Sequence, residues 1–363
     1  MKNKLKVATV FSGIGAIEHA LQRMGIPTEI VFACDIDKYC KQSYLANYNI
    51  KEENWIEDIN DIKGDKFNGK VDLLVGGSPC QSFSMVGKRK GLADPRGLLI
   101  YQFVRLVKEI QPKYFIYENV KGLLNHGQSE TWRKLKATLD KTKYNIYVKI
   151  LNAKDYGIPQ NRERMFVIGF KKKIKFEFPK PKELKLTMQD FLEDNPQSKY
   201  FLPEKGIAFV TKEKNLKKSY TQINGKIALC QKRNQQFNWH GDFIMEFPKG
   251  AVDEKYFLSD KVKNYVTSSG TKTFYSKPET DLKVARPLLA TMAKMHRAGI
   301  DNYITKGGKI RKLTPRECLR LMGFDDRFKI VVSDTQAYKQ AGNAIVVDVL
   351  IHLLKAMDIE QHV

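Results

Sequence analysis

Short apolar runs that alternate with helix-like segments are the feature that most restricts the fold of this chain. Such runs occupy residues 6–11, 30–34, 71–75 and 114–117, and a helical pattern follows the first of them. Apolar runs this short are typical of strands that are buried inside a sheet. The sequence therefore predicts an open α/β sheet, with its ligands at the edge where the strands end.

A glycine turn follows the first run, at Gly13, Ile14 and Gly15, and a helix pattern begins directly after it. Such a turn brings backbone N–H groups close to a ligand. The third glycine of a dinucleotide-binding fingerprint is absent, which disfavours a nicotinamide-dependent dehydrogenase. Asp35 ends the second run, where an acidic residue is placed to bind ribose hydroxyls. Asp37 fits equally well as the cap of the next helix.

The third run leads into Gly76-Gly77-Ser78-Pro79-Cys80. Two glycines let the backbone leave the strand sharply, and Pro79 restricts the conformation just before the cysteine. A polar, basic stretch follows and can form a lid. Cys80 is therefore a candidate nucleophile, and the alternative is a small buried apolar residue.

Polar residues also follow the later strands. Glu118 ends the fourth run and would lie on the same sheet edge as Cys80 and Asp35. Its alternative role is a helix N-terminal charge. Arg162 and Arg164 alternate in an extended segment and are expected to share one face. That face suits phosphate or carbonyl recognition, or else a surface salt-bridge ladder with Glu163.

Charge and cysteine content restrict the partners. Among 363 residues, 63 Lys and Arg stand against 40 Asp and Glu, a net charge of +23. This charge favours nucleic acid as a partner, then an anionic membrane surface, although lysine-rich surfaces are also common without either. The five cysteines form no CxxC pair, so neither a disulfide framework nor a metal site is expected. No apolar run is long enough to span a membrane, and no signal peptide is visible, so an intracellular protein is expected.

A change in pattern near Pro179 and Pro181 predicts a domain boundary. Residues 1–180 with 325–363 are expected to form a catalytic, cofactor-binding domain. Residues 181–310 are expected to form an irregular recognition domain, and residues 311–324 a connecting helix. Thr314 followed by Pro315 and Glu317 predicts the start of that helix with a capping box. Residues 341–357 are expected to form a further helix that packs on the first domain.

Six segments, in their order along the chain, resemble the DNA cytosine-C5 methyltransferases of bacterial restriction–modification systems, of the HhaI methyltransferase type. They are Phe11-Ser12-Gly13-Ile14-Gly15, Pro79-Cys80-Gln81, Glu118-Asn119-Val120, Gln160-Asn161-Arg162-Glu163-Arg164, Arg311-Lys312-Leu313-Thr314-Pro315-Arg316-Glu317-Cys318 and Gln340-Ala341-Gly342-Asn343-Ala344. Residues 181–285 match none of the motifs, as expected for the variable recognition segment of that family. The sequence departs from the family pattern at Ala16, Ser78 and Ala344.

The resemblance implies a Rossmann-like domain that binds S-adenosylmethionine and releases S-adenosylhomocysteine, with a smaller, mainly β domain for target recognition. It assigns cofactor contacts to Phe11, Gly13, Ile14, Gly15, Asp35, Ile36, Asp58, Ile59, Pro79, Leu99, Asn343 and Ala344. It implies DNA contacts from the stretch after Cys80, by Gln81, Ser82, Ser84, Lys88, Arg89, Lys90 and Arg96.

The implied reaction needs a soft nucleophile that can also leave, which favours Cys80 for addition at C6 of cytosine. Glu118 would stabilise charge at N3, which requires that burial raise its pKa. Arg164 is assigned to the O2 carbonyl, with Arg162 supporting it or binding a phosphate. The base must first be flipped out of the duplex.

The expected partner is double-stranded DNA, with a restriction endonuclease of the same specificity as a functional rather than physical partner. A monomer in the cytoplasm of a bacterial or phage-infected cell is expected, without membrane attachment. Two alternatives remain open: a tRNA cytosine-C5 methyltransferase, and a catalytically inactive DNA-binding regulator on the same fold.

Overall fold

The computed structural model divides the chain into two compact units, each described here by itself. The first unit comprises residues 1–152, 163–180 and 345–363, and the second comprises residues 153–162 and 181–344. The structure describes residues 4–79, 95–125, 130–194, 196–197, 200–202, 204–217, 221–223, 240–247, 282–288, 298–301 and 303–362.

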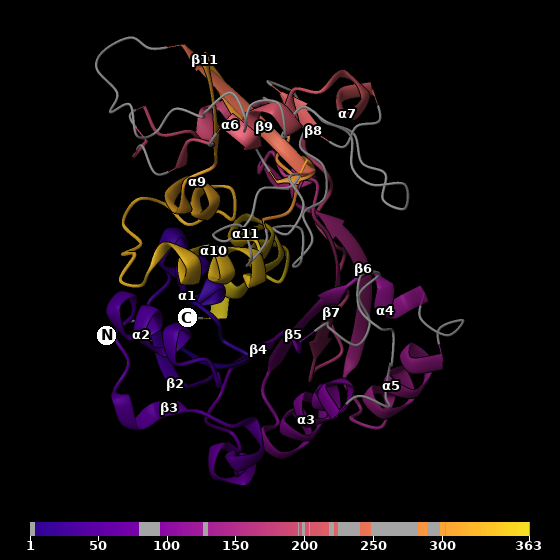
Figure 1. Cartoon of the computed structure of the whole chain (residues 1–363). Helices are drawn as coiled ribbons and strands as arrows, with labels where there is room; N and C mark the ends of the chain where they lie inside the picture. The colour runs from indigo at the N-terminus through magenta and orange to yellow at the C-terminus, as the bar shows by residue number, and fades with distance from the viewer. Residues whose placement is uncertain are drawn as a thin grey trace. The chain divides into compact units, whose positions relative to one another are not determined.

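A sheet of seven strands organises the described part of the first unit, in the spatial order β3-β2-β1-β4-β5-β7-β6 (Figure 1). Its strands are β1 (Leu5–Val10), β2 (Thr28–Cys34), β3 (Trp55–Ile56), β4 (Leu73–Gly76), β5 (Tyr114–Val120), β6 (Asn145–Asn152) and β7 (Glu163–Phe170). The five strands from β3 to β5 are parallel, while β7 pairs antiparallel with both β5 and β6. The strand order reverses between β1 and β4, and open α/β sheets bind ligands at such a switch point.

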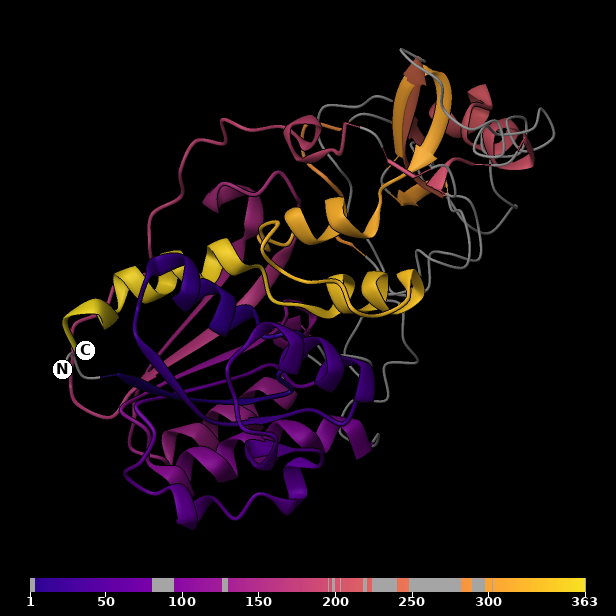
Figure 2. The ribbon, with the colours of Figure 1, turned by 90° about the vertical axis from the view of Figure 1, so that its left-hand side faces the viewer.

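The first unit's described α-helices are α1 (Ala16–Met24), α2 (Lys38–Asn47), α3 (Pro95–Ile110), α4 (Gly122–Asn125), α5 (Glu130–Asp140) and α11 (Val347–Ala356). Helices α1 and α11 contact each other on one face of the sheet, while α3 and α5 contact each other on the other face (Figure 2). Arg23 of α1 donates to Asp348 of α11 through both guanidinium Nη atoms, at 2.7 and 3.0 Å. This paired contact ties the C-terminal helix to the first helix of the unit.

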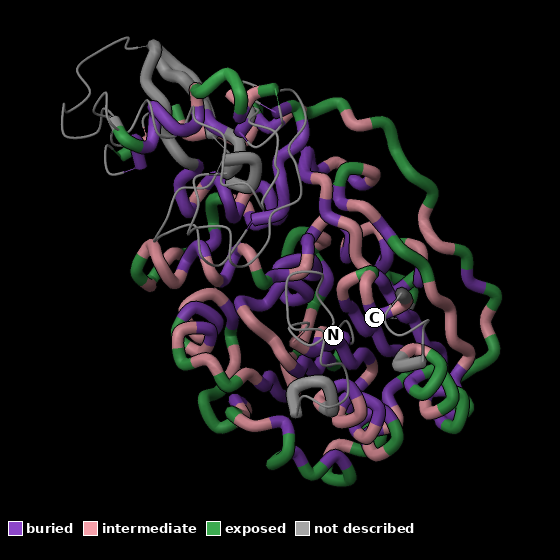
Figure 3. The backbone as a smooth tube through the Cα atoms, turned by 45° about the vertical axis from the view of Figure 1, so that its right-hand side comes forward, coloured by how far each residue is buried: buried purple, intermediate pink, exposed green. Residues whose placement is uncertain are grey.

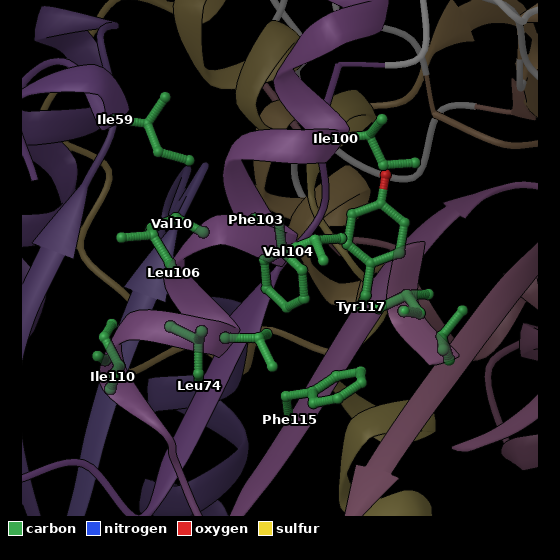
Figure 4. Packing of buried hydrophobic residues seen from close by; sticks show 14 of the residues in the cluster. Val10, Ile59, Leu74, Ile100, Phe103, Val104, Leu106, Ile110, Phe115 and Tyr117 are labelled. Carbon is green, nitrogen blue, oxygen red and sulfur yellow. The ribbon is translucent and has the colours of Figure 1, made fainter. Parts of the chain in front are cut away.

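The core of the first unit follows from the apolar runs in the sequence. All of β4 is buried, and so is β5 apart from Val120. Figure 3 colours the backbone of the described residues by how far each is buried. Alternate strand residues such as Leu74 and Phe115 point toward α3, where Phe103 and Val104 pack against them (Figure 4). Continuous apolar strands that are covered on both faces are typical of parallel sheets. The α/β fold class predicted from the sequence is therefore confirmed.

The second unit combines four short α-helices with short strands among its described residues. They are α6 (Glu204–Val210), α7 (Glu213–Lys217), β8 (Thr221–Ile223), β9 (His240–Phe247), β10 (Ala298–Asp301), β11 (Tyr303–Lys312), α9 (Pro315–Arg320) and α10 (Asp334–Asn343). Strand β9 pairs in parallel with β8, β10 and β11. The predicted capping box is confirmed at α9: Glu317 N–H donates to Thr314 Oγ1 at 3.2 Å, and Thr314 N–H donates to Glu317 Oε2 at 2.8 Å.

One helix differs from the prediction. Instead of one helix over residues 341–357, the chain forms α10 and α11 with a break at residues 344–346. The backbone is extended at Ala344, with ψ at 155°. Arg162 Nη2 donates to the carbonyl oxygens of Gly342 and Ala344, at 3.0 Å each, and thereby satisfies acceptors left over at the end of α10. The contacts that set this break join residues 180 and 182 positions apart in the sequence, so the local pattern could not predict it.

In the part of the chain that the structure describes, no helix is both long and apolar enough to cross a membrane. The same residues hold no group of three or more His, Cys, Asp or Glu side chains that could bind a metal ion.

Candidate active site

The turn after β1 has the backbone that a glycine-rich ligand turn requires. Phe11, Gly13 and Gly15 all have positive φ, at 54°, 55° and 78°. At Gly15 a Cβ would lie 2.1 Å from a ring carbon of Tyr48, whose hydroxyl donates to the carbonyl oxygens of Ile14 and Gly15 at 3.0 and 2.7 Å. Only glycine fits there without moving the ring, so the turn is closed against α2 in a fixed shape.

Asp35 connects the ends of β1 and β2. Its Oδ2 accepts from the backbone N–H of Gly13 at 2.8 Å, and its Oδ1 accepts from that of Asp37 at 2.9 Å. The carboxylate is thus oriented at the switch edge of the sheet. Asp37 caps α2 by accepting from Tyr39 N–H at 2.9 Å, which confirms the capping alternative for this residue.

The neighbouring predicted cofactor residues differ in exposure. Ile36 is 80% exposed, which is unusual for a large apolar side chain, and it directly follows Asp35. Asp58 caps the short 3-10 helix η2 (Ile59–Asp61), and its Oδ1 accepts from Asn60 N–H at 2.8 Å. Ile59 is buried in the core beneath α3, and Leu99 packs partly buried against that core. The cofactor contacts assigned to these residues stay predictions.

Glu118 and Arg164 form an ion pair at the carboxyl end of β5. Arg164 Nε lies 3.1 Å from Glu118 Oε1, and the two side chains are only 19% and 12% exposed. They meet because β5 and β7 are antiparallel with Glu118 opposite Phe166, so Arg164 is a diagonal neighbour on the same face. Their register, which the sequence alone does not give, thus brings together two residues that were predicted separately.

The backbone that leads toward Cys80 runs beside this pair. Gly76 lies opposite Tyr117 in the β4–β5 ladder. A Cβ on Gly77 would lie 3.0 Å from Glu118 Oε2 and 3.2 Å from the Glu118 carbonyl oxygen. A side chain at position 77 would crowd Glu118, so glycine suits the point where the chain leaves β4 beside this carboxylate.

Arg162, Asn343 and Ala344 belong to the second unit. Arg162 is 4% exposed, and its Nη2 holds the turn that contains Asn343, through the carbonyl oxygens of Gly342 and Ala344. The structure therefore gives Arg162 a role in fixing this turn. Its predicted contact to the base or to a phosphate stays a prediction.

Several predicted residues lie outside the described residues: Cys80, Gln81, Ser82, Ser84, Lys88, Arg89 and Lys90. Arg96 lies in α3, but its side chain is not among those described, and Pro79 is half-buried at the end of the described segment. The geometry of the site thus rests on the glycine turn, Asp35, and the Glu118–Arg164 pair.

Comparison with known proteins shows to which protein family the chain belongs. The family model described as C-5 cytosine-specific DNA methylase matches residues 5–358, nearly the whole chain. The chain is a C-5 cytosine-specific DNA methylase. The resemblance seen in the sequence is thereby confirmed, and the methylase is an enzyme of the DNA (cytosine-5-)-methyltransferase class.

Relatives match the methylase over most of their length. Type II methyltransferase M.HhaI of Haemophilus parahaemolyticus is 32% identical, covering 95% of this chain and 92% of the relative. Orphan methyltransferase M.SPRI of Bacillus phage SPR is 30% identical, covering 98% of this chain and 97% of the relative. The solved structure of Entamoeba histolytica methyltransferase EhMeth has a TM-score of 0.65 at 20% identity, covering 99% of both chains, which shows the shared fold.

The structure of the methylase also shows a buried acid that the sequence pattern did not single out. Glu18 of α1 is 3% exposed. Its Oε1 accepts from Tyr44 Oη at 2.5 Å and from Thr9 Oγ1 at 3.1 Å, and Thr9 Oγ1 shares a hydrogen bond with Ser12 Oγ at 2.7 Å. Burial raises the pKa of Glu18 from 4.5 to about 7. Through Thr9 and Ser12, this network reaches the glycine turn after β1.

Replacement of Glu18 by glutamine is expected to stabilise the methylase at pH 8 and to change little at pH 4.5. Between pH 4.5 and about 7 the folded state holds a proton that the unfolded state releases, so wild-type stability falls as pH rises through this range. Glutamine does not titrate, so the variant's advantage grows over the same range, to at most ~3 kcal/mol. Urea unfolding at pH 4.5, 6, 7 and 8 measures this.

The control is Glu29→Gln, because Glu29 is an exposed acid on β2 of the same unit. Its unfolding free energy is expected to follow the wild-type pH curve. Parallel curves for wild type and Glu18→Gln would show that folding does not raise the pKa of Glu18.

Proposed function

We propose that the methylase transfers a methyl group from S-adenosylmethionine to C5 of a cytosine that is flipped out of a specific duplex DNA sequence, through a covalent bond between Cys80 and C6. The observation that supports this most strongly is the Glu118–Arg164 ion pair at 3.1 Å. The pair lies beside Gly77, three residues before Cys80. An acid and a guanidinium near a cysteine are the groups that this addition needs.

The residues around the β1–β2 edge fit the cofactor. Asp35 is held by two backbone N–H groups at the end of β2, which supports a role in accepting hydrogen bonds from ribose hydroxyls. The exposed Ile36 side chain offers an apolar surface for the adenine. When bound, S-adenosylmethionine supplies an electrophilic methyl group on its sulfonium sulfur. The chain's own task is to hold this group in line with C5 of the base.

The base is activated by nucleophilic addition. The Cys80 thiolate forms a bond to C6, and the electron pair of the C5–C6 double bond becomes available at C5. C5 then bonds to the methyl carbon, and the methyl–sulfur bond breaks to give S-adenosylhomocysteine. Loss of the C5 proton to water restores the double bond and releases the thiolate.

Glu118 and Arg164 have separate roles in this sequence of steps. A proton shared between the Glu118 carboxyl group and N3 offsets the negative charge that develops in the ring, and the carboxyl oxygen accepts from the 4-amino group. Arg164 donates to O2, because a guanidinium has five N–H donors and can serve both Glu118 and the base.

DNA is the substrate, and the chain's net charge of +23 suits a polyanion. The target base cannot react inside the stacked duplex, so it must be flipped into the site at a cost of a few kcal/mol. We propose that the segment after Cys80 binds phosphates and closes over the base, and that residues 181–310 select the sequence.

The methylase is further proposed to protect DNA in a bacterial restriction–modification system, as a cytoplasmic monomer. Type II methyltransferases among the relatives support this role. An orphan methyltransferase of a phage is also similar, and it favours the alternative without a partner endonuclease. Bisulfite sequencing of DNA from cells that express the methylase gives the target site, and a search for an endonuclease that cuts the same site separates the two roles.

Duplex DNA with 5-fluorocytosine at the target is expected to trap the methylase covalently at Cys80. Addition and methyl transfer proceed, but C5 carries fluorine in place of the proton that must leave. A gel shift that withstands denaturation, with peptide mass spectrometry, measures the adduct. Total tRNA is the matched substrate for the RNA alternative. An adduct on another cysteine, or faster methylation of tRNA than of duplex DNA, would contradict the proposal.

A further inference from the structure

A buried cluster of hydrogen bonds lies directly before Cys80 in the chain. Ser78 Oγ and Tyr117 Oη are 2.6 Å apart. Asn119 Nδ2 donates to Tyr117 Oη at 2.7 Å and to Ser78 Oγ at 3.2 Å, and it lies 3.3 Å from the Ser78 carbonyl oxygen. The three side chains are 5%, 1% and 1% exposed. The cluster therefore fixes both the side chain and the backbone of Ser78.

The orientation of the cluster is set by the backbone of β5. Asn119 Oδ1 accepts from the N–H of Val120 at 2.9 Å, so its amide nitrogen must face Ser78 and Tyr117. Strand β4 ends at Gly76, so the ladder with β5 no longer holds the chain at Ser78. Hydrogen bonds from the side chains of Tyr117 and Asn119 hold the chain at Ser78, beyond the last backbone pairing of β4 with β5.

We propose that the Ser78–Tyr117 hydroxyl pair positions the Cys80 backbone for attack on C6. This inference rests on the proposed function of Cys80. The Tyr117 ring also packs in the core, with its centroid 5.0 Å from that of Phe103 (Figure 4). Packing needs only the ring, whereas the hydroxyl forms hydrogen bonds with Ser78 and Asn119. Tyr117 and Ser78 are thus positioning residues that act through Cys80.

Three variants separate positioning from general stability. Tyr117→Phe keeps the ring and removes one hydroxyl, and Ser78→Ala removes the other. The matched control is Tyr144→Phe, because Tyr144 is also buried and its hydroxyl donates to Pro112 O at 2.5 Å. Tyr144 contacts β5 at the opposite end, and its ring packs on Phe115 at 5.3 Å.

The measurement is the single-turnover rate of adduct formation at Cys80 with 5-fluorocytosine duplex, beside the Kd for DNA and for S-adenosylhomocysteine. Tyr117→Phe and Ser78→Ala are each expected to slow the adduct about 10- to 100-fold, because small displacements of a nucleophile have effects of this size. Both Kd values should stay within about twofold, since both hydroxyls are buried and bonded to each other. The double variant should be no slower than the slower single variant, as expected for groups that act as a unit.

Rates within about twofold of wild type for Tyr117→Phe, or an equal slowing in Tyr144→Phe, would overturn the inference. Additive losses in the double variant would also overturn it. Folding of each variant is checked by thermal unfolding, and Ser78→Ala gives an independent result where Tyr117→Phe is unstable. If the wild-type enzyme forms no adduct at Cys80, the proposed function itself is wrong. This outcome differs from the results above, in which the wild-type enzyme forms the adduct and only the rates of the variants contradict the inference.

Discussion

Replacement of Cys80 by alanine is expected to abolish methyl transfer to DNA, with a loss of at least about 10⁴-fold, because alanine cannot add to C6. C5 of cytosine is a poor nucleophile until that bond forms, so the remaining groups cannot compensate. Binding of S-adenosylmethionine should remain, because the proposed cofactor residues of the glycine turn and Asp35 follow β1 and β2 rather than β4. Transfer of a labelled methyl group to duplex DNA measures the first effect, and calorimetry measures the second.

The cysteines that the structure describes serve as controls for this prediction. Cys34, Cys40 and Cys318 are buried. Burial, followed by the charges of nearby aspartates, raises the pKa of Cys34 to about 12, so it is a thiol rather than a nucleophilic thiolate at neutral pH. Cys40→Ala is expected to keep activity within about twofold. Residual methylation in Cys80→Ala, or its loss in Cys40→Ala, would contradict the assignment of the nucleophile.

The strands of the first unit could be predicted from the sequence because their signals are local. The runs at residues 6–11 and 30–34 became β1 and β2 with shifts of one or two residues at their ends. Continuous apolar runs leave few other arrangements when both faces of the sheet are covered by helices.

The contacts of the site could not be predicted in the same way, because they depend on register and on distant partners. Glu118 meets Arg164 only through the pairing of β5 with β7. In the sequence, Tyr117 is part of an apolar run. In the structure, its hydroxyl forms a hydrogen bond with Ser78, which follows the neighbouring strand β4. The only indication in the sequence was a hydroxyl-bearing side chain within an apolar run, because a buried hydroxyl needs a hydrogen-bond partner. Glu18 likewise needed Thr9 and Tyr44 from two other elements before its burial could be explained.

Replacement of Glu118 by glutamine is expected to reduce methyl transfer about 10²- to 10⁴-fold, the usual range for a lost general acid–base group. Glutamine keeps the shape and can hydrogen-bond to the base, but it cannot exchange a proton with N3. It also removes the charge that pairs with Arg164 Nε at 3.1 Å. The covalent adduct with Cys80 should form more slowly by a similar factor, since charge at N3 develops as the C6 bond forms.

Glu163→Gln is the matched control, because Glu163 lies on the neighbouring strand and pairs with Lys121 at the surface, where the two side chains are 40% and 47% exposed. An exposed pair contributes at most about 1 kcal/mol, so this variant should keep activity within about twofold. Equal losses in both variants would mean that general disturbance of β5 and β7 causes the effect. A loss confined to Glu118→Gln, with cofactor affinity unchanged, would instead locate the effect at the base, because the carboxyl group faces Gly77 and Arg164 rather than the glycine turn.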